Sequence, residues 1–160
     1  MSIVEQTLQC TKKCNFKKIL EQIRSDAIPN IPGYEDSKVL ELQDDGENIT
    51  KIMRRKLPIS KMASMALGTQ HGVFECYIKY DQNKIVIYTS NPEIFKRYFE
   101  YSETVTIMDN KDGTINIIRE SKTINHTSSN IVKKYFAGNI EDKYHHECMF
   151  FIECMVDICK

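Results

Sequence analysis

Hydrophobic and polar residues alternate along much of this chain in short runs, a period that is typical of strands with one buried face. Between the runs stand turn signals such as Asp44-Asp45-Gly46 and Asn110-Lys111-Asp112-Gly113. Runs joined by such short turns predict hairpins, and therefore an antiparallel sheet. The expected strands are 3–11, 38–43, 48–57, 73–80, 84–89, 98–108 and 114–125.

Two segments show instead the three- and four-residue spacing of an amphipathic helix. The first is expected from Phe16 to about Asp26, because Asn15 can cap it and a turn rich in proline and glycine follows at 27–33. The second is expected after residue 130 and runs to the end of the sequence. Gly138 lies inside the second segment and costs about 1 kcal/mol relative to Ala, so the helix can kink there.

The order of these elements predicts an α+β fold class. A final helix that is amphipathic over about 30 residues needs a broad apolar surface to cover, and the concave face of a curved sheet supplies one. We therefore expect a helix-grip architecture, with a curved antiparallel sheet of about six to seven strands and the long C-terminal helix across its concave face. The length of 160 residues favours a single domain over 1–160.

Composition narrows the function classes. Lys and Arg together number 22, as do Asp and Glu, so overall charge does not steer the protein toward nucleic acid or an anionic membrane. No apolar run approaches the roughly 20 residues of a membrane helix, and the start lacks the pattern of a signal peptide, so we expect a soluble protein. The 6 cysteines form no CxxC pair and are expected to be free thiols.

Signals for a metal site or for catalysis are weak. His145, His146 and Cys148 stand close together, but no second group of ligands has zinc spacing, so no metal is expected. Ser60 and His71 stand in no nucleophile elbow and beside no obvious base, so we expect no catalytic residue and no cofactor.

The segment from Leu57 to Gly72 is longer than a hairpin loop needs to be. It is apolar and rich in methionine, a side chain that adapts to varied apolar ligands, and it ends in glycines. Two interpretations stay open: a lid over a ligand cavity, or a short helix packed into the core. The candidate lid and cavity residues are Leu57, Pro58, Ile59, Met62, Met65, Leu67 and Gly68.

A basic run, Met53-Arg54-Arg55-Lys56, precedes this segment. On a strand, Arg54 and Lys56 share one face and Arg55 takes the other. The run is either a solvated edge strand, since charges often protect edges, or a clamp for a phosphate, since the arginine fork suits phosphate oxygens.

Several short motifs occur in one order along nearly the whole chain. They are the Pro29-Asn30 turn, Lys56-Leu57-Pro58 before the apolar segment that ends near Gly68, Asn91 after Tyr88-Thr89-Ser90, Tyr101-Ser102-Glu103-Thr104-Val105-Thr106, and Glu147-Cys148-Met149-Phe150-Phe151-Ile152. In this order they resemble the PRELI/MSF1 family of mitochondrial intermembrane-space phospholipid transfer proteins, which have a START-like helix-grip fold. Phe151 stands where that family often has Trp, and this chain contains no Trp.

The resemblance implies a lipid carrier, without enzymatic activity, that extracts one acidic phospholipid and shuttles it between membranes. The implied cargo is phosphatidic acid or phosphatidylserine. The implied location is the mitochondrial intermembrane space or a mitochondrion-derived organelle, and the implied partner is a small helical hairpin with paired cysteines. The candidate residues for the phospholipid head group are Arg24, Lys38, Arg54, Lys56, Lys133 and Lys143.

Two other functions stay open from the sequence. One is a helix-grip interaction module whose interior is filled by side chains, and the other is a carrier of a different apolar ligand, such as a sterol. Co-purified phospholipid would exclude the first. Charge reversal at Arg24 or Lys56 should abolish phospholipid transfer and leave a sterol carrier largely intact.

Overall fold

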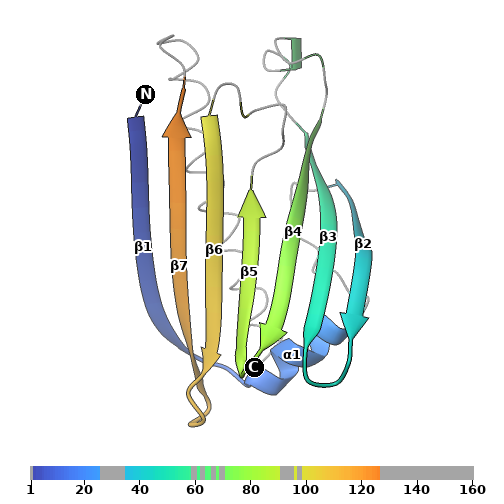
Figure 1. Cartoon of the computed structure of the whole chain (residues 1–160), viewed down its shortest axis with the longest axis vertical. Helices are drawn as coiled ribbons and strands as arrows, with labels where there is room; N and C mark the ends of the chain where they lie inside the picture. Colours follow the sequence, from blue (N-terminus) through green and yellow to red (C-terminus); the bar gives the residue numbers. More distant parts are fainter. Residues whose placement is uncertain are drawn as a thin grey trace.

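The computed structural model describes residues 2–25, 35–58, 61, 64–65, 68, 71–90, 96 and 99–126, which form one sheet and one helix (Figure 1). The elements, in chain order, are β1 (Ser2–Lys13), α1 (Phe16–Arg24), β2 (Glu35–Asp44), β3 (Ile49–Pro58), β4 (His71–Asp81), β5 (Lys84–Ser90), β6 (Phe99–Asp109) and β7 (Thr114–Asn125).

The sheet has seven strands in the order β1-β7-β6-β5-β4-β3-β2. Every neighbouring pair is antiparallel. From β2 to β7 each strand pairs with the next in sequence, while β1 crosses to pair with β7. Gly46 and Gly113 occupy two of the hairpin turns with φ of 93° and 85°, a backbone region that side chains with a Cβ disfavour. The predicted antiparallel sheet of about six to seven strands is therefore confirmed.

The helix α1 begins where the sequence predicts. The side chain of Asn15 accepts a hydrogen bond from the backbone N–H of Lys17 at 3.1 Å, as an N-cap residue does. The helix ends at Arg24, two residues before the expected end. Its buried side chains are Phe16, Ile19 and Ile23, which recur at helical spacing along one face.

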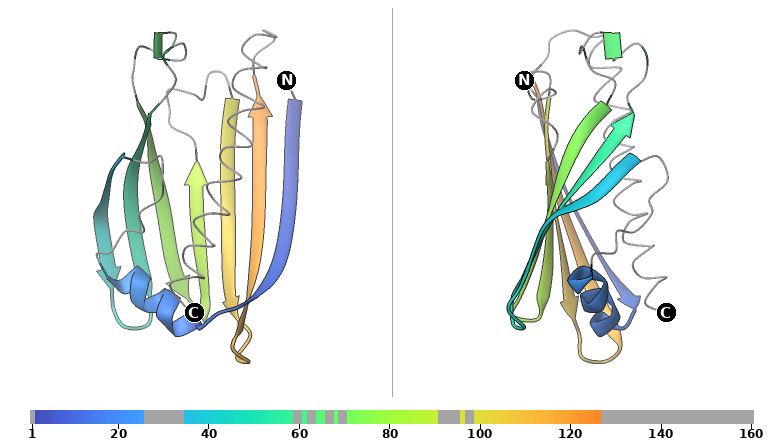
Figure 2. Two further views of the ribbon diagram at one scale, coloured as in Figure 1. Left: turned by 180° about the vertical axis from the view of Figure 1, so that it is seen from behind. Right: turned by 90° about the vertical axis from the view of Figure 1, so that its right-hand side faces the viewer.

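The sheet is strongly twisted and bends around α1, which lies on one side of it near the hairpin turns (Figure 2). We name the face that packs against α1 the inner face and the opposite one the outer face. The buried apolar cluster lies between α1 and the inner face and consists of Cys14, Phe16, Ile19, Ile23, Ile49, Met53, Ile78, Ile85, Ile87, Val105, Ile107, Ile115 and Ile117.

The expected long helix after residue 130, with Gly138, lies outside the described residues. In the part of the chain that is described, no helix is long and apolar enough to span a membrane.

Candidate functional site

The inner face changes in character along the strands. Residues that stand directly opposite each other on neighbouring strands form rows across the sheet, and each row can be followed from β3 to β7. The row nearest α1 is wholly apolar apart from one tyrosine hydroxyl. It consists of Ile49, Tyr80, Ile85, Ile107 and Ile117. This row closes the core beneath α1.

Moving away from α1, the rows become polar. The second row has an apolar centre and a cation at each end, and consists of Lys51, Ile78, Ile87, Val105 and Arg119. The third row carries most of the polar groups and consists of Met53, Cys76, Thr89, Glu103 and Ser121. We name the polar members of these rows, with their inward-facing neighbours farther along β3 and β6, the polar band. It comprises Lys51, Arg55, Cys76, Thr89, Tyr101, Glu103, Arg119 and Ser121.

The centre of the polar band is a buried ion pair between neighbouring strands. Arg119 on β7 is 3% exposed and Glu103 on β6 is 5% exposed. The Arg119 Nε and Nη2 atoms lie 2.7 Å and 2.6 Å from Glu103 Oε2. The hydroxyl of Tyr101 donates to the same carboxylate oxygen and accepts from Arg119 Nη2 at 3.0 Å. The three side chains therefore hold one another in place.

The side chain of Lys51 joins the polar band to α1. Lys51 is 2% exposed, and its Nζ donates to the backbone carbonyl of Ser25 at 2.7 Å. Ser25 is the C-cap residue of α1, where carbonyl groups lack partners within the helix and a cation is favourable. The buried ammonium of Lys51 thus also fixes one end of the helix.

Cys76 lies at the middle of the polar band. The hydroxyl of Thr89 is 3.8 Å from its Sγ. Burial raises the pKa of the Cys76 thiol, while the positive charges of Arg55 and Lys51 lower this pKa and the carboxylate of Glu103 raises it. Because all three charges act on one thiol, they belong to a single electrostatic environment that reaches from β3 to β6.

The structure separates the head-group residues expected from the sequence from the polar band. Lys38 stands opposite Arg54, and Arg54 pairs with Glu75 at 2.7 Å. Lys56 pairs with Asp36 at 3.2 Å. These cations alternate with the buried residues of β3 and therefore lie on the outer face, which brings them together but away from the inner face.

Arg24, at the end of α1, is placed separately from both groups. Its Nη2 donates to the carbonyl of Gly46 at 2.9 Å, and its Nε lies 3.4 Å from the carboxylate of Asp44. It ties α1 to the turn between β2 and β3. A head-group role for Arg24, Lys38, Arg54 or Lys56 stays a prediction.

Only part of the expected lid is described. The backbone of Leu57 and Pro58 forms the last two positions of β3. Met65 is 80% exposed, and Gly68, with φ of 69°, donates its N–H to the carbonyl of Ser64 at 2.9 Å. The remaining lid candidates, Ile59, Met62 and Leu67, and the helix candidates Lys133 and Lys143 lie outside the described residues.

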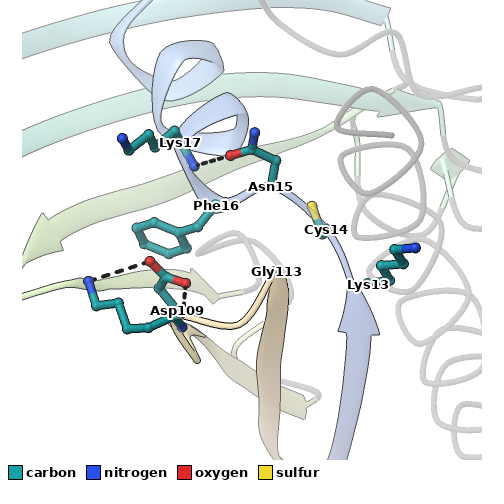
Figure 3. A pocket seen from close by; sticks show the side chains of 8 residues that line it. Lys13, Cys14, Asn15, Phe16, Lys17, Asp109 and Gly113 are labelled. Atoms are coloured by element: carbon teal, nitrogen blue, oxygen red, sulfur yellow. Dashed lines mark hydrogen bonds and ion pairs between the residues drawn. The ribbon is translucent and has the colours of Figure 1, made fainter.

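A pocket of about 860 Å³ lies at the start of α1, beside the turn between β6 and β7 (Figure 3). Lys13 and Lys17 point in different directions from its rim, and Asp109 pairs with Lys111 at 3.4 Å. Its polar groups do not converge on one point, so we place the candidate site at the polar band.

Metal and catalytic candidates are few within the described residues. No three His, Cys, Asp or Glu side chains among them gather as metal ligands. The Nε2 atom of His126 lies 2.6 Å from Oε1 of Glu100, and both side chains are partly exposed. The cluster of His145, His146 and Cys148 lies outside the described residues.

Reasoning from sequence missed the polar band as a site, although it assigned Arg55 to the face opposite Arg54. The signal was present in the alternation. Arg119 continues the inward series that begins with Ile115 and Ile117, and Glu103 shares its face with Val105. A charged residue at an inward position of an apolar strand is unusual, and the alternation of residue types is enough to reveal it.

Comparison with known proteins identifies the fold. No protein-family model and no curated protein matches the chain. Among solved structures, a START superfamily protein from Mycobacterium smegmatis matches with a TM-score of 0.52 and 15% identity, over 97% of this chain and 97% of that chain. A protein from Thermus thermophilus matches with a TM-score of 0.56 and 8% identity, over 98% of this chain and 97% of the other.

A third neighbour is the Zhui aromatase/cyclase from Streptomyces sp. R1128. Its TM-score is 0.53 and its identity 7%, over 99% of this chain and 92% of the enzyme. At such low identity these likenesses concern the fold alone. The protein therefore has the START-like helix-grip fold in its sheet and first helix.

Proposed function

We propose that this protein is a carrier that holds one acidic phospholipid, phosphatidic acid or phosphatidylserine, against its inner face and shuttles it between membranes. The observation that supports this most is the charge of the polar band. Among the described residues of the inner face, the buried charged side chains are three cations, Lys51, Arg55 and Arg119, and one carboxylate, Glu103.

An excess of buried cations favours an anionic ligand. Moving a charged group out of water is costly unless an opposite charge and hydrogen bonds accompany it. A phosphate group supplies both, and the planar fork of Arg55 suits two phosphate oxygens at once. The head group of the lipid would therefore lie at the polar band.

The apolar part of the inner face complements the rest of a lipid. Each acyl CH₂ group that leaves water gains about 0.8 kcal/mol, so two chains bind firmly to a dry apolar surface. Release requires only that the membrane offer the same environment. The proposed activity needs no covalent chemistry, no metal and no cofactor.

Two further supports are the START-like fold and the resemblance to the PRELI/MSF1 family. The fold is compatible with ligand binding between the sheet and the elements that cover it. From the resemblance we also propose a small helical-hairpin partner with paired cysteines, and a location in the mitochondrial intermembrane space or a mitochondrion-derived organelle.

The first experiment is extraction of the purified protein with organic solvent, followed by mass spectrometry of the extract. We expect one phospholipid per protein. Transfer is then measured between donor liposomes that carry labelled phosphatidic acid or phosphatidylserine and unlabelled acceptors. An extract free of phospholipid, together with no transfer above the spontaneous rate, would overturn the proposal in favour of an interaction module.

Neighbouring arginines provide a sharp test of where the head group binds. Arg55 lies on the inner face and Arg54 on the outer face, so Arg55→Gln and Arg54→Gln make the same chemical change in different surroundings. We expect Arg55→Gln to reduce phospholipid transfer at least tenfold. Because Arg54 is itself a head-group candidate, a third variant, Lys79→Gln on the outer face of β4, serves as the control and should leave transfer unchanged. If Arg54→Gln loses phospholipid transfer and Arg55→Gln does not, the head group binds on the outer face instead. If neither arginine variant changes the uptake of lipid, the cargo needs no cation and is a neutral lipid such as a sterol.

A further inference from the structure

We infer that β1 pairs along its free edge with β1 of a second copy of this chain, so that two molecules form one continuous antiparallel sheet. The free edge is the side of β1 that faces away from β7. β1 lies at one end of the strand order, as Figure 1 shows, and no strand among the described residues pairs with this side of it. The inference goes beyond the proposed carrier function and does not depend on the ligand.

The two edge strands of the sheet differ in how they are protected against such pairing. The register of β2 with β3 shifts twice, and Asp36 within β2 has a positive φ of 47°, irregularities that commonly prevent an edge from pairing. β1 has no such irregularity. Its 12 residues pair with β7 in one unbroken register, and positions 6–11 contain neither a charge nor a proline. A long, regular edge of this kind is a template for another strand.

The pairing of β1 with β7 decides which residues offer backbone groups at the free edge. The N–H of Cys14 donates to the carbonyl of Gly113 at 3.1 Å, and these residues continue the register in which Lys13 stands opposite Thr114. Backbone groups along a strand point alternately to its two sides, so those of the even-numbered residues point to β7. The odd-numbered residues of 5–13 therefore direct their N–H and C=O groups to the free edge.

Symmetry limits how a second copy can join this edge. Two identical strands in antiparallel pairing are related by a two-fold axis perpendicular to the sheet. Side chains that stand opposite each other then lie on the same face, so an odd-numbered residue always meets an odd-numbered one. The possible registers differ only in which residue of β1 lies at the axis.

The charges of β1 select one of these registers. With the axis at Gln9, Glu5 of each copy stands opposite Lys13 of the other on the outer face. No other register places Glu5 opposite a lysine of β1, and an axis at Glu5, Lys12 or Lys13 would place like charges opposite each other. Opposite charges across two strands stabilise their pairing, and like charges weaken it. The strand is therefore complementary to itself in one register.

The charged groups that this register joins are accessible. The side chain of Glu5 is 66% exposed, although it lies 3.2 Å from Lys122 of β7, and Lys13 is exposed as well. The carboxylate of Glu5 can thus accept a second cation from a neighbouring copy.

The same register brings apolar side chains together on the inner face. Leu8 stands opposite the inward-facing Arg119 of β7, so the even-numbered residues of β1 share the inner face. Beside an axis at Gln9, Leu8 of each copy meets Cys10 of the other. Leu8 is 45% exposed, and pairing would remove part of its surface from water. Backbone direction, charge and apolar contact therefore agree on one arrangement.

A proline at the axis tests whether the free edge is the interface. Gln9→Pro removes an N–H that points to the free edge and none that points to β7, and edge strands accept proline in such positions. We expect the wild-type protein to be a dimer by sedimentation equilibrium, and Gln9→Pro to associate at least tenfold more weakly. Gln9→Ala keeps the N–H and is the matched control, which should stay dimeric. A wild-type protein that is monomeric up to its highest soluble concentration, or a dimer unchanged in Gln9→Pro, would overturn the inference.

Charge reversal tests the register. Lys13→Glu places two carboxylates opposite each other twice in the dimer, and we expect association to weaken about tenfold. Adding Glu5→Lys to Lys13→Glu exchanges the two charges and should restore most of the affinity. The exposed pair of Glu5 with Lys122 is lost in that double variant, which should affect the fold little. A double variant that associates no better than Lys13→Glu alone would rule out this register.

Cross-linking gives a readout that needs no proline and decides the matter even where circular dichroism shows that Gln9→Pro fails to fold. In the proposed dimer the two copies of residue 9 stand opposite each other with about 5.5 Å between their Cα atoms, within reach of a disulfide. The two copies of residue 7 are four positions, or roughly 13 Å, apart along the strand. Under mild oxidation we expect Gln9→Cys to form a disulfide between copies at this position, identified by mass spectrometry, and the matched variant Thr7→Cys to form none at position 7. Equal yields in the two variants would contradict the inference.

Discussion

The two ends of the inner face use the same strands and the same pairing but opposite chemistry. Near α1, isoleucines such as Ile85 and Ile107 are essentially inaccessible and pack against the helix. In the polar band, Glu103 and Arg119 are almost as buried, yet they are charged. Burial of the first kind stabilises the fold directly, whereas a buried ion pair adds little net stability because desolvation offsets its attraction. The apolar rows near α1 therefore stabilise the fold, whereas the polar band is the part of the inner face that a ligand would need.

Breaking the ion pair should give the largest effect. Arg119→Met leaves the Glu103 carboxylate buried without its cation, and we expect the free energy of unfolding to fall by about 3–5 kcal/mol. Replacing both partners, in Glu103→Leu with Arg119→Met, should restore most of that stability, although the polar band then lacks both charges. Urea denaturation measures the free energy of unfolding of both variants. A double variant as unstable as the single one would show that the polar band supports the fold after all.

Removing packing at the apolar end should come next in size. Ile107 is 1% exposed, and Ile107→Ala is expected to lower the free energy of unfolding by about 2–5 kcal/mol through lost burial and a cavity. The matched control is Ile118→Ala on β7, whose side chain is only partly buried. Thermal and urea unfolding compare the two. Equal losses at both positions would argue against a core confined to the inner face.

The outer-face pair should matter least for stability. Arg54 and Glu75 have side chains 38% and 50% exposed, and ion pairs of this kind contribute about 0.2–1 kcal/mol. We expect Arg54→Ala to change the free energy of unfolding within that range, and less at high salt. A loss above about 2 kcal/mol would place Arg54 among the residues that hold the sheet, contrary to its exposure.

The thiol of Cys76 offers a small but specific readout of the polar band. Its pKa lies above the ordinary range because of burial, so the thiol stays protonated at neutral pH and reacts slowly with iodoacetamide. Arg55 lowers this pKa, and Arg55→Gln should therefore raise it and shift the rise of the alkylation rate to higher pH. Mass spectrometry of the labelled peptide follows the rate. A profile unchanged by the substitution would mean that Arg55 does not act on this site.

The strands and α1 could be predicted from the sequence because their signals are local. Alternation, the cap at Asn15 and the turn residues each act within a few positions. The expected boundaries of most elements differ from the observed ones by only a few residues.

The composition of the site could not be predicted in the same way. Glu103 and Arg119 become neighbours only through the pairing of β6 with β7, and Lys51 meets Ser25 only through the docking of α1. The basic run at 54–56 attracted attention as a cluster. Alternation divides such a cluster between two faces, so density of charge in the sequence did not indicate density of charge in space.

The pairing of β1 with β7 has a consequence for how the chain is made. Thr11 and Asn116, which hydrogen-bond at 2.7 Å, are 105 positions apart in the sequence. At the usual speed of translation, about 5–20 residues per second, β1 has to wait about 5–20 s for its only partner strand among the described elements to be synthesised. Hairpins from β2 onward can form meanwhile, because their contacts are local. Among the described strands, β1 is thus made first and joins the sheet last, and its backbone N–H and C=O groups stay open to pairing with other chains during that interval.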